Sequence, residues 1–376
     1  MKNNNLHVVF LPQTDVHKGN PYWQQLQASM ENEGAVFVET EDKFYLQWRW
    51  LLQNRRQVDV IHLHFLKHHY TVREEANSLS MLVKFVFKLM LARLLGYELI
   101  WTVHNLYPHE KLQPVYVERL ARIVVAQLST KIIVHCDYAR DALAKAFFRR
   151  RKVYTLPHPN YIPAYPNTVS KSEARSQLNI PDDKRVILFQ GAIRPYKGIN
   201  LLVDAFKRID GDHLTLLIAG KPDRSVPSEA IQALAEGDTR IKIFPYYIPD
   251  DELQIYFNAA DLAVLPYTNV LSSGSALLAM SFGCPIIAPA IGCLPEVVQP
   301  GTGLMYDVSE TDSLYKALLE GVSLDLELLG KNAYEHAKRF RWETVGKQTL
   351  QVYQGKLEND ADFPPPFSVN YSSKSY

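Results

Sequence analysis

Residues 185–198, which read RVILFQGAIRPYKG, are the stretch of this 376-residue chain that is most informative about its fold. The apolar, β-branched run at 185–190 predicts a buried strand, and the pattern of a helix follows the loop after it. Gly191 begins that loop, which carries Arg194 and Lys197. A strand followed by a turn and a helix is the repeating unit of parallel α/β sheets. The stretch therefore predicts an α/β domain with a positively charged loop at the end of a strand.

The same alternation of strand and helix extends in both directions. Strand-like runs occur at 7–12, 35–38, 58–63, 98–103, 131–135 and 153–156 in the first half, and at 185–190, 214–219, 241–244, 262–265 and 285–288 in the second. Helical spacing separates the first six runs, at 22–33, 44–57, 78–95, 115–128 and 139–149. We therefore expect two doubly wound, parallel α/β domains, which bind ligands at the carboxyl ends of their strands.

A proline-rich segment divides the chain into these two domains. Residues 157–166 contain four prolines and two tyrosines, a composition that favours an extended linker. We expect an N-terminal domain at 1–165, a C-terminal domain at 166–340 and a further helix at 341–357. The remaining residues, 358–376, are rich in proline and serine and lack apolar periodicity, so they predict a mobile tail.

Composition and cysteine content indicate the class of protein and its compartment. Apolar residues make up 47% and charged residues 22% of the chain, as in ordinary globular proteins. The three cysteines, Cys136, Cys284 and Cys293, have no paired spacing, so we expect neither a disulfide framework nor a zinc site. The N-terminus shows no signal-peptide pattern. These features predict a reducing, cytoplasmic location.

Charge is unevenly distributed between the two halves. Residues 1–160 hold 21 Lys and Arg against 14 Asp and Glu, whereas residues 161–376 hold 20 against 26. The cations of the first half lie among large apolar residues, most clearly at 44–56 and 78–95, which favours an anionic membrane surface over a nucleic acid as partner. We therefore expect peripheral attachment to the inner face of the cell membrane. In 78–95 the apolar residues at helical spacing face either the membrane or the sheet; they are Met81, Leu82, Phe85, Leu89 and Leu95.

Two loops of the second domain are suited to a diphosphate. The loop from Gly191 places the guanidinium of Arg194, the ammonium group of Lys197 and free backbone N–H groups at the start of a helix. The tripeptide Ser272-Ser273-Gly274 precedes another helix with hydroxyl groups and bare amides. The alternatives are a basic turn with a capping glycine for the first loop and an ordinary N-cap for the second.

Polar side chains suited to catalysis follow two strands of the first domain. His104 and Glu110 lie in the loop after the strand at 98–103, and Asp15 and His17 lie in the loop after the first strand. Carboxylates and imidazoles are common general acids and bases. Asp15, His104 and Glu110 are therefore the candidate catalytic residues, with His17 in reserve. The alternative is that both loops are polar surface turns.

The sequence lacks the usual motifs for metals and for other phosphate chemistry. His62 and His64 alternate along a strand, with His68 and His69 beyond it, but no carboxylate or thiolate accompanies them. The chain has no Asp-x-Asp, no Walker phosphate loop and no Gly-x-Ser-x-Gly elbow. We expect no metal and no other cofactor, and phosphate binding by amides, arginine and lysine.

Together these motifs resemble those of glycosyltransferase family 4, a group of enzymes with the GT-B architecture. The resemblance implies two Rossmann-like domains facing each other across a cleft, with a nucleotide-sugar donor on the second domain and a glycan or glycolipid acceptor on the first. It is strongest in the second domain, at 189–198, 217–221, 260–267, 285–288, 292–298 and 301–304. In the first domain it covers 59–64 and 101–105.

The resemblance also implies roles for particular residues. Arg194 and Lys197 would neutralise the donor diphosphate, and the amides of Ser273 and Gly274 would hold it. His104 would contact the donor sugar or its phosphate.

The chain departs from the family at two positions that matter for stereochemistry. Retaining members carry two glutamates in the donor loop, and Val270 and Leu278 occupy the matching positions here. Without those carboxylates we expect inversion by direct displacement, in which a base deprotonates the acceptor hydroxyl. The leading hypothesis is metal-independent transfer of a hexose from a nucleoside-diphosphate sugar to a lipid-linked or polysaccharide-precursor acceptor. The alternative is a non-catalytic protein that binds nucleotide sugars or glycans.

Overall fold

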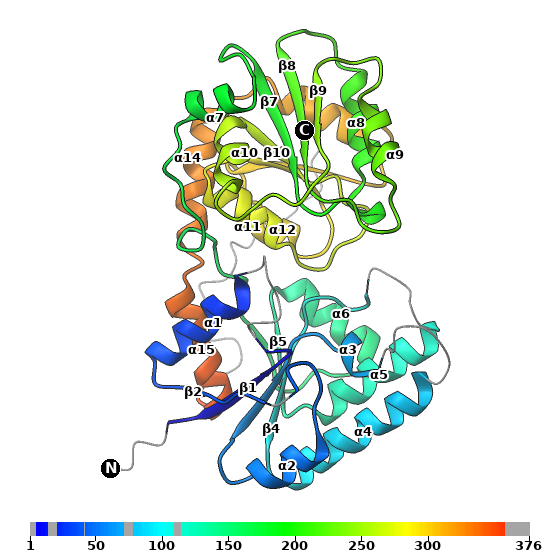
Figure 1. Cartoon of the computed structure of the whole chain (residues 1–376), viewed down its shortest axis with the longest axis vertical. Helices are drawn as coiled ribbons and strands as arrows, with labels where there is room; N and C mark the ends of the chain where they lie inside the picture. Colours follow the sequence, from blue (N-terminus) through cyan, green and yellow to red (C-terminus); the bar gives the residue numbers. More distant parts are fainter. Residues whose placement is uncertain (1–4, 14–20, 41, 71–77, 109–113, 358–376) are drawn as a thin grey trace.

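The computed structural model describes residues 5–13, 21–40, 42–70, 78–108 and 114–357. Within these ranges the chain forms two α/β units, one above the other in Figure 1. The predicted tail at 358–376 lies outside the described residues, and so do Asp15, His17 and Glu110.

Each unit is built on a six-stranded sheet whose neighbouring strands are parallel. The first sheet has the order β2-β1-β3-β4-β5-β6, and the second has the order β12-β11-β10-β7-β8-β9. This topology confirms the two doubly wound domains predicted from the sequence. The strands of the first sheet are β1 (His7–Leu11), β2 (Val36–Phe37), β3 (Val60–Leu63), β4 (Glu98–Thr102), β5 (Lys131–Val134) and β6 (Val153–Thr155). Those of the second are β7 (Arg185–Gln190), β8 (Leu214–Ala219), β9 (Ile241–Phe244), β10 (Leu262–Val264), β11 (Ile286–Pro289) and β12 (Gly303–Tyr306).

The edge strand β12 is one that the sequence pattern did not reveal. Of its four residues only Tyr306 is buried, so no apolar run marks the strand. Its first residue, Gly303, lies so close to β11 that an added Cβ would be 2.1 Å from the carbonyl oxygen of Ile286. The strand therefore depends on a close backbone approach that glycine permits.

Residues alternate along β1 between two apolar cores, one on each face of the first sheet. Val8 and Phe10 belong to the core formed with α1 (Tyr22–Asn32) and α15 (Trp342–Gln354), whereas Val9 and Leu11 belong to the core on the opposite face. The helices on that opposite face are α2 (Trp48–Asn54), α4 (Ser78–Leu94), α5 (Val115–Leu128) and α6 (Asp137–Phe147), with the single turn α3 (Lys67–Tyr70) before α4.

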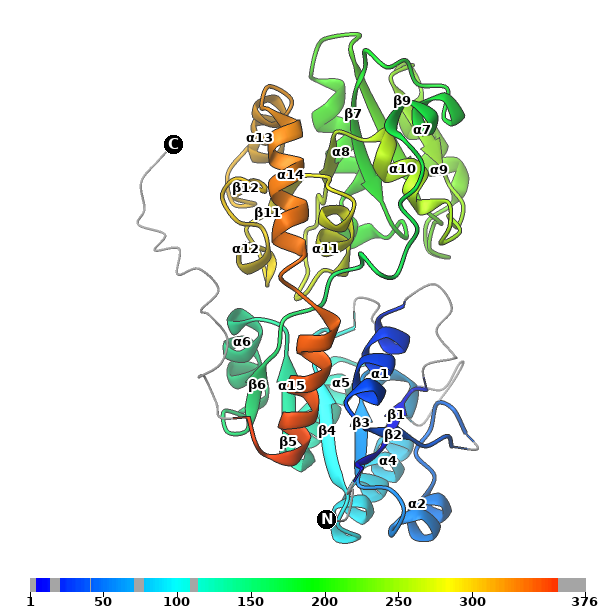
Figure 2. The same ribbon diagram turned by 90° about the vertical axis from the view of Figure 1, so that its left-hand side faces the viewer.

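Helix α15 packs on the first sheet although the chain reaches it only after the second domain, as Figure 2 shows beside α1. The Ser29 hydroxyl of α1 donates a 2.7 Å hydrogen bond to the carbonyl oxygen of Trp342. The Trp342 indole N–H donates another of 2.7 Å to the carbonyl oxygen of Asn160 in the linker. At Gly346 an added Cβ would lie 2.2 Å from Ser29 Oγ, so the two helices are in close contact. The predicted C-terminal helix thus completes the core of the first domain.

Most of the apolar stripe that the sequence assigned to a membrane packs on the sheet instead. Leu82, Phe85 and Leu89 of α4 are buried in the core that contains β3, and Met81 and Leu95 are partly buried against it. These five side chains hold this segment on the sheet, so of the two orientations that the sequence left open, the one toward the sheet is correct and the one toward a membrane is wrong. Within the described ranges, no helix combines the length and the apolar composition needed to cross a membrane.

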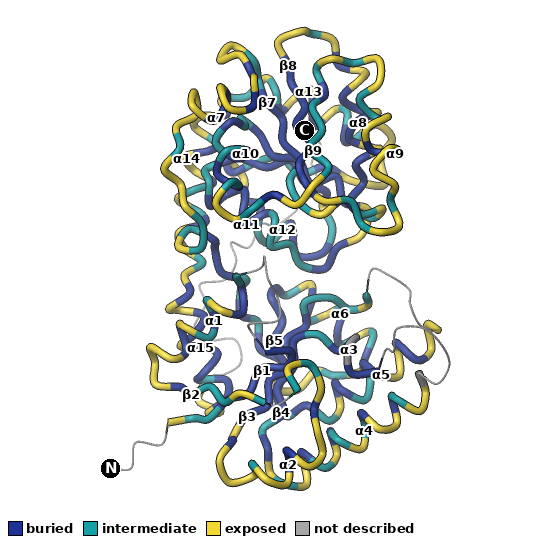
Figure 3. Tube along the Cα trace, in the orientation of Figure 1, coloured by how far each residue is buried: buried dark blue, intermediate teal, exposed yellow. Residues whose placement is uncertain are grey.

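The second sheet is likewise sandwiched between helices around a large buried core, which Figure 3 shows inside the upper unit. This core contains Phe189 of β7 and Phe206 of the following helix, both fully buried. The helices of the second domain are α7 (Lys171–Gln177), α8 (Ile199–Lys207), α9 (Ser228–Gln232), α10 (Leu253–Ala259), α11 (Gly274–Ser281), α12 (Leu294–Val297), α13 (Ser313–Gly321) and α14 (Leu326–Ala337). Two short 3-10 turns, η2 (Pro195–Lys197) and η3 (Ala233–Ala235), accompany them.

A disulfide joins the two domains. It links Cys136, which precedes α6, to Cys293, which precedes α12, across a sequence separation of 157 residues. The expectation that the cysteines stay unpaired is wrong for these two residues, because only the tertiary fold brings them together. Cys284 remains a buried free thiol whose pKa is raised by burial. The reducing compartment was inferred from unpaired cysteines, so the cytoplasmic location stays a prediction.

We expect reductant to lower the thermal unfolding midpoint of the wild-type chain. A cross-link over so long a loop restricts the unfolded chain, with an entropic contribution of about 4–5 kcal/mol. In Cys136→Ser the midpoint should be low with or without dithiothreitol, whereas Cys284→Ala should keep the dependence on reductant. Scanning fluorimetry of the three proteins tests this, and a wild-type midpoint indifferent to reductant would contradict it.

Candidate functional site

The carboxyl ends of the two sheets meet through polar contacts as well as the disulfide. The Ser272 hydroxyl donates a 2.9 Å hydrogen bond to the carbonyl oxygen of His104. The Glu296 carboxylate accepts hydrogen bonds from the backbone N–H groups of Asp137 and Tyr138, at 2.9 and 2.8 Å. Those N–H groups form the first turn of α6, where the helix dipole favours a negative charge. The loops after the strands of both sheets are therefore held against each other.

The loop after β7 has a backbone shape that glycine permits. Gly191 has a φ of +131° and Gly198 a φ of +66°, and a Cβ at Gly198 would lie 2.0 Å from the carbonyl oxygen of Pro266. Between them, the 3-10 turn η2 brings Lys197 back over Gly191, where an added Cβ would be 2.7 Å from Lys197 Nζ. The loop thus places an ammonium group directly beside a bare backbone segment.

The ammonium group of Lys197 is buried, with 9% of the residue exposed. Burial lowers its pKa, the nearby Tyr196 raises it, and Arg194 lowers it. Among the described residues, no carboxylate forms an ion pair with Lys197, and the Arg194 side chain lies 3.8 Å from Asp223. A buried cation without a counterion is unfavourable. Binding of an anion here would remove that penalty.

The N-terminus of α11 completes this anion site. Ser273 is the N-cap of α11, Gly274 is its first residue, and Lys197 Nζ lies 5.5 Å from the ring centroid of Tyr267. Burial raises the pKa of Tyr267, while the neighbouring Ser275 and Ser273 hydroxyls lower it. The hydroxyl groups of Tyr267 and Ser273 are buried without a hydrogen-bond partner among the described residues. Hydroxyl groups, helix N–H groups and an ammonium group together match the chemistry of a diphosphate.

Linker residues set the shape of the same site. A Cβ at Gly274 would lie 2.7 Å from the Tyr161 hydroxyl and 3.4 Å from His158 Nε2. Neither Tyr161 nor His158 was singled out from the sequence, where they read as part of a proline-rich linker. The glycine at the start of α11 therefore provides room for the linker side chains, which a larger residue would displace.

On the opposite side, a row of histidines follows β3, β4 and β5. His64 Nδ1 lies 3.1 Å from His104 Nε2, and His104 Nδ1 lies 3.3 Å from His135 Nε2. His135 Nδ1 lies 3.1 Å from the carbonyl oxygen of Leu156, which can only accept, so this nitrogen carries the proton. Burial lowers the pKa of His135 to about 4, so the ring is neutral at pH 7 and its Nε2 accepts from His104. The row thereby fixes the orientation of the His104 ring.

His62 lies next to this row and is hydrogen-bonded through both ring nitrogens. Its Nδ1 lies 2.5 Å from the Tyr353 hydroxyl of α15, and its Nε2 lies 2.7 Å from Thr102 Oγ1. Burial raises the pKa of Tyr353 well above its ordinary value, so the phenol stays protonated. Burial is the main reason that the pKa of His62 lies well below its ordinary value, and the nearby His104 and His135 lower it further. His62 is therefore a neutral link between β3, β4 and α15.

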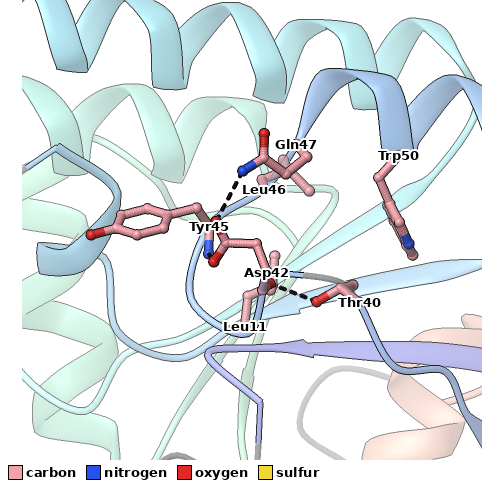
Figure 4. Close-up of a pocket in the computed structure, with 7 residues that line it drawn as sticks. All are labelled: Leu11, Thr40, Asp42, Tyr45, Leu46, Gln47 and Trp50. Atoms are coloured by element: carbon pink, nitrogen blue, oxygen red, sulfur yellow. Dashed lines mark hydrogen bonds between the residues drawn. The ribbon is translucent and has the colours of Figure 1, made fainter.

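A small hollow near the carboxyl end of β1 has a structural explanation. It is lined by Leu11, Thr40, Asp42, Tyr45, Leu46, Gln47 and Trp50 (Figure 4). The Asp42 carboxylate accepts from the backbone N–H groups of Phe44 and Tyr45, both at 3.0 Å, and from Gln47 Nε2 at 2.9 Å. With these hydrogen bonds Asp42 shapes its own loop, so we assign it no role in the site.

The structure gathers the predicted donor-binding residues at one place. Gly191, Lys197, Ser273 and Gly274 surround the anion site, Arg194 lies beside Lys197, and Ser272 turns toward His104. Val270 and Leu278, where retaining enzymes carry glutamates, are buried in the second core. Within the described ranges, no three His, Cys, Asp or Glu side chains are arranged as metal ligands. The roles of the predicted site residues, and of Asp15 and Glu110, stay predictions.

Two kinds of relatives match this chain in sequence. Residues 170–339 match the family described as "Glycosyl transferases group 1". A protein of Xanthomonas campestris pv. campestris named GDP-mannose:glycolipid 4-beta-D-mannosyltransferase is 26% identical over 346 residues, which cover 91% of this chain and 90% of that protein. The D-inositol 3-phosphate glycosyltransferase of Corynebacterium urealyticum is 31% identical over 221 residues, or 54% of this chain and 52% of that protein.

Solved structures share the arrangement of both domains. Sucrose-phosphate synthase from Thermosynechococcus elongatus aligns with a TM-score of 0.70 at 19% identity, over 93% of this chain and 99% of that one. Anabaena HepE in complex with UDP-glucose aligns with a TM-score of 0.69 at 17% identity, over 93% of this chain and 100% of that one. At such identities the likeness establishes the fold.

We expect Lys197→Met to lower kcat by about 100-fold or more, because it removes a positive charge from a buried anion site. Arg194→Ala should also lower turnover by orders of magnitude. Lys207→Met is the matched control, since its ammonium group lies on the surface of α8 and hydrogen bonds to the carbonyl oxygen of Glu236. Steady-state kinetics with far-UV circular dichroism test this. Unchanged turnover in both site variants would refute the anion assignment.

The buried histidines predict a loss of stability in acid. Burial lowers the pKa of His135 to about 4 and that of His158 to about 3, against about 6.5 in an unfolded chain. Between pH 6.5 and 4 the unfolded chain binds protons that the folded chain does not. The free energy of unfolding should therefore decrease as the pH is lowered, by up to about 1.4 kcal/mol per pH unit for each histidine.

Urea titrations from pH 7.5 to 4.5 measure that slope. His135→Asn should reduce this slope by the contribution of about one bound proton, because Asn cannot titrate. Identical slopes in wild type and His135→Asn would contradict the assignment.

Proposed function

We propose that this chain, a glycosyltransferase of the GT-B fold, transfers a hexose from a nucleoside-diphosphate sugar to a glycolipid or another polysaccharide precursor. The observation that carries the proposal is the buried ammonium group of Lys197. It lies between Gly191 and the N-terminus of α11, and no described carboxylate pairs with it. A diphosphate is the group that such a site neutralises.

We propose mannose as the hexose and GDP as the nucleotide to be tested first. The Xanthomonas protein named GDP-mannose:glycolipid 4-beta-D-mannosyltransferase aligns over 91% of this chain, so both of its domains have counterparts here. A glycolipid acceptor on the first domain also accords with the excess of cations in residues 1–160.

We further propose that the reaction inverts the anomeric centre. Val270 and Leu278 are apolar and buried, so neither can supply the carboxylate that retaining members of the family carry in the donor loop. A β-mannoside formed from GDP-mannose, in which mannose is α-linked, requires inversion. The name of the Xanthomonas relative specifies a β linkage, which supports the same stereochemistry here.

The proposed mechanism is a direct displacement. The acceptor hydroxyl oxygen bonds to the anomeric carbon while the bond between that carbon and the diphosphate oxygen breaks, and the electron pair leaves with the diphosphate. A base of the first domain takes the hydroxyl proton, with Asp15 and Glu110 as candidates and His17 in reserve. Arg194, Lys197 and the amides of α11 stabilise the charge that develops on the leaving group. We place the reaction on the cytoplasmic face of the membrane.

A donor panel tests this function. Purified protein incubated with UDP-, GDP- and dTDP-sugars should release free nucleotide fastest from GDP-mannose, and more rapidly with extracted glycolipid present. Proton NMR of the product should show a β-linked sugar. An α-linked product would overturn inversion, and binding of GDP-mannose without any hydrolysis or transfer would indicate a protein that only binds nucleotide sugars.

We expect transfer to survive EDTA. The proposed diphosphate site uses Lys197, Arg194 and amides, so no metal bridge is required. Activity in 5 mM EDTA, compared with activity after added Mg²⁺ or Mn²⁺, measures this. Loss of transfer that is restored by either ion would contradict the proposal.

A further inference from the structure

Helix α4 exposes a second apolar stripe, opposite the one that packs on the sheet. Its members are between 50% and 82% exposed, and they follow one another at intervals of three or four residues; they are Leu79, Val83, Phe87, Met90 and Leu94. Figure 3 shows the alternation of buried and exposed positions along α4. A helix needs one apolar stripe to join a sheet, so the second stripe is unexplained by folding.

The flanks of this stripe carry cations, and the helix itself has no acid, although two described carboxylates outside α4 lie within electrostatic reach, Asp42 near Lys88 and Glu98 near Arg93. Lys84, Lys88 and Arg93 are the charged residues of α4. On the neighbouring helices, α2 adds the exposed Arg49 and α5 adds the exposed Arg119. The acid of these three helices, Glu118 of α5, is buried in an ion pair with Arg122; α2 and α4 have none.

The loop between α6 and β6 extends the same chemistry at the end of α4. Phe148 is 67% exposed, and residues 149–152 read RRRK. This loop lies near the end of α4, because Arg93 lowers the pKa of Arg149 in addition to the larger effect of burial. Large apolar side chains and cations thus occur together along the whole outer side of α4 and at its end.

We propose that this face, formed by the exposed stripe of α4 with the cations of α2, α5 and residues 148–152, docks on the surface of an anionic membrane. Apolar side chains enter the interface while lysine and arginine contact lipid phosphates. A second copy of the chain fits less well, because a two-fold contact through this face would bring cation against cation.

The docking proposal rests on the proposed function, and it explains how a glycolipid acceptor in the membrane would reach the site. A crossover helix in a parallel sheet begins near the carboxyl ends of the strands, so the Leu79 end of α4 lies toward the side where the histidine row is located. A membrane along α4 would therefore present a glycolipid head group beside the carboxyl ends of β3 and β4.

Vesicle co-sedimentation tests the docking surface. Wild-type protein should bind vesicles of 70% phosphatidylcholine and 30% phosphatidylglycerol, bind pure phosphatidylcholine at least tenfold less, and release from the anionic vesicles in 0.5 M NaCl. Val83→Glu and Phe87→Glu should each lower binding at least tenfold. Both positions are exposed, and each substitution replaces an apolar side chain with a negative charge that the anionic lipid repels. Leu328→Glu on α14 is the matched control, since Leu328 is 54% exposed but belongs to the second domain.

The outcomes separate the docking proposal from the proposed function. Hydrolysis of GDP-mannose in solution should be unchanged in Phe87→Glu, because α4 contributes nothing to the donor site. Docking that depends on Phe87 without any sugar transfer would refute the function and leave the docking surface intact. Equal sedimentation of wild type and Phe87→Glu would overturn the docking surface. So would light scattering that shows a wild-type dimer and a Phe87→Glu monomer.

Discussion

A parallel strand can rejoin its sheet only through a crossover along one face, and this constraint arranges both domains. Every loop that follows a strand must open at the same edge of its sheet. His64, His104 and His135 therefore form one row although three different strands carry them. The same rule brings the Gly191 loop after β7 beside the N-terminus of α11, beyond β10. The faces of each sheet must also be covered, which is why α15 returns to the first domain.

Burial gives the two sides of the site opposite electrostatic characters. On the first domain, burial keeps His135 and His62 neutral, so this side offers polar atoms without net charge. On the second domain, Lys197 is buried together with Arg194 nearby, and this side favours an anion. A glycosyl donor needs that division, because negative charge develops on the leaving diphosphate while the acceptor side has only to accept a proton.

The features that could be predicted from the sequence were those coded locally. The strands other than β12 and the Gly191 loop depend on runs of adjacent residues, and they appear in the structure. Contacts between distant segments could not be predicted in this way, as the Cys136–Cys293 disulfide and the capping of α6 by Glu296 show. The face of α4 that packs on the sheet could not be predicted for another reason. Its apolar residues fit two stripes on opposite sides, and periodicity alone does not tell which one faces the sheet.

The loop that contains Val270 and Leu271 is held by both domains, and this accounts for an apolar residue at a position that the family resemblance matches to a glutamate. Cys293 donates its backbone N–H to the carbonyl oxygen of Leu271 at 2.7 Å, and both residues belong to the core of the first domain. A Cβ at Gly292 would lie 2.3 Å from the carbonyl oxygen of Val270, so the loop lies directly against the backbone at Gly292. Val270 itself is buried in the second core. A carboxylate there would lose its hydration and its pKa would rise, so it could not act as an anion beside the sugar. In the proposed reaction the loop that the two domains clamp would hold the diphosphate, and the proton chemistry would fall to the first domain.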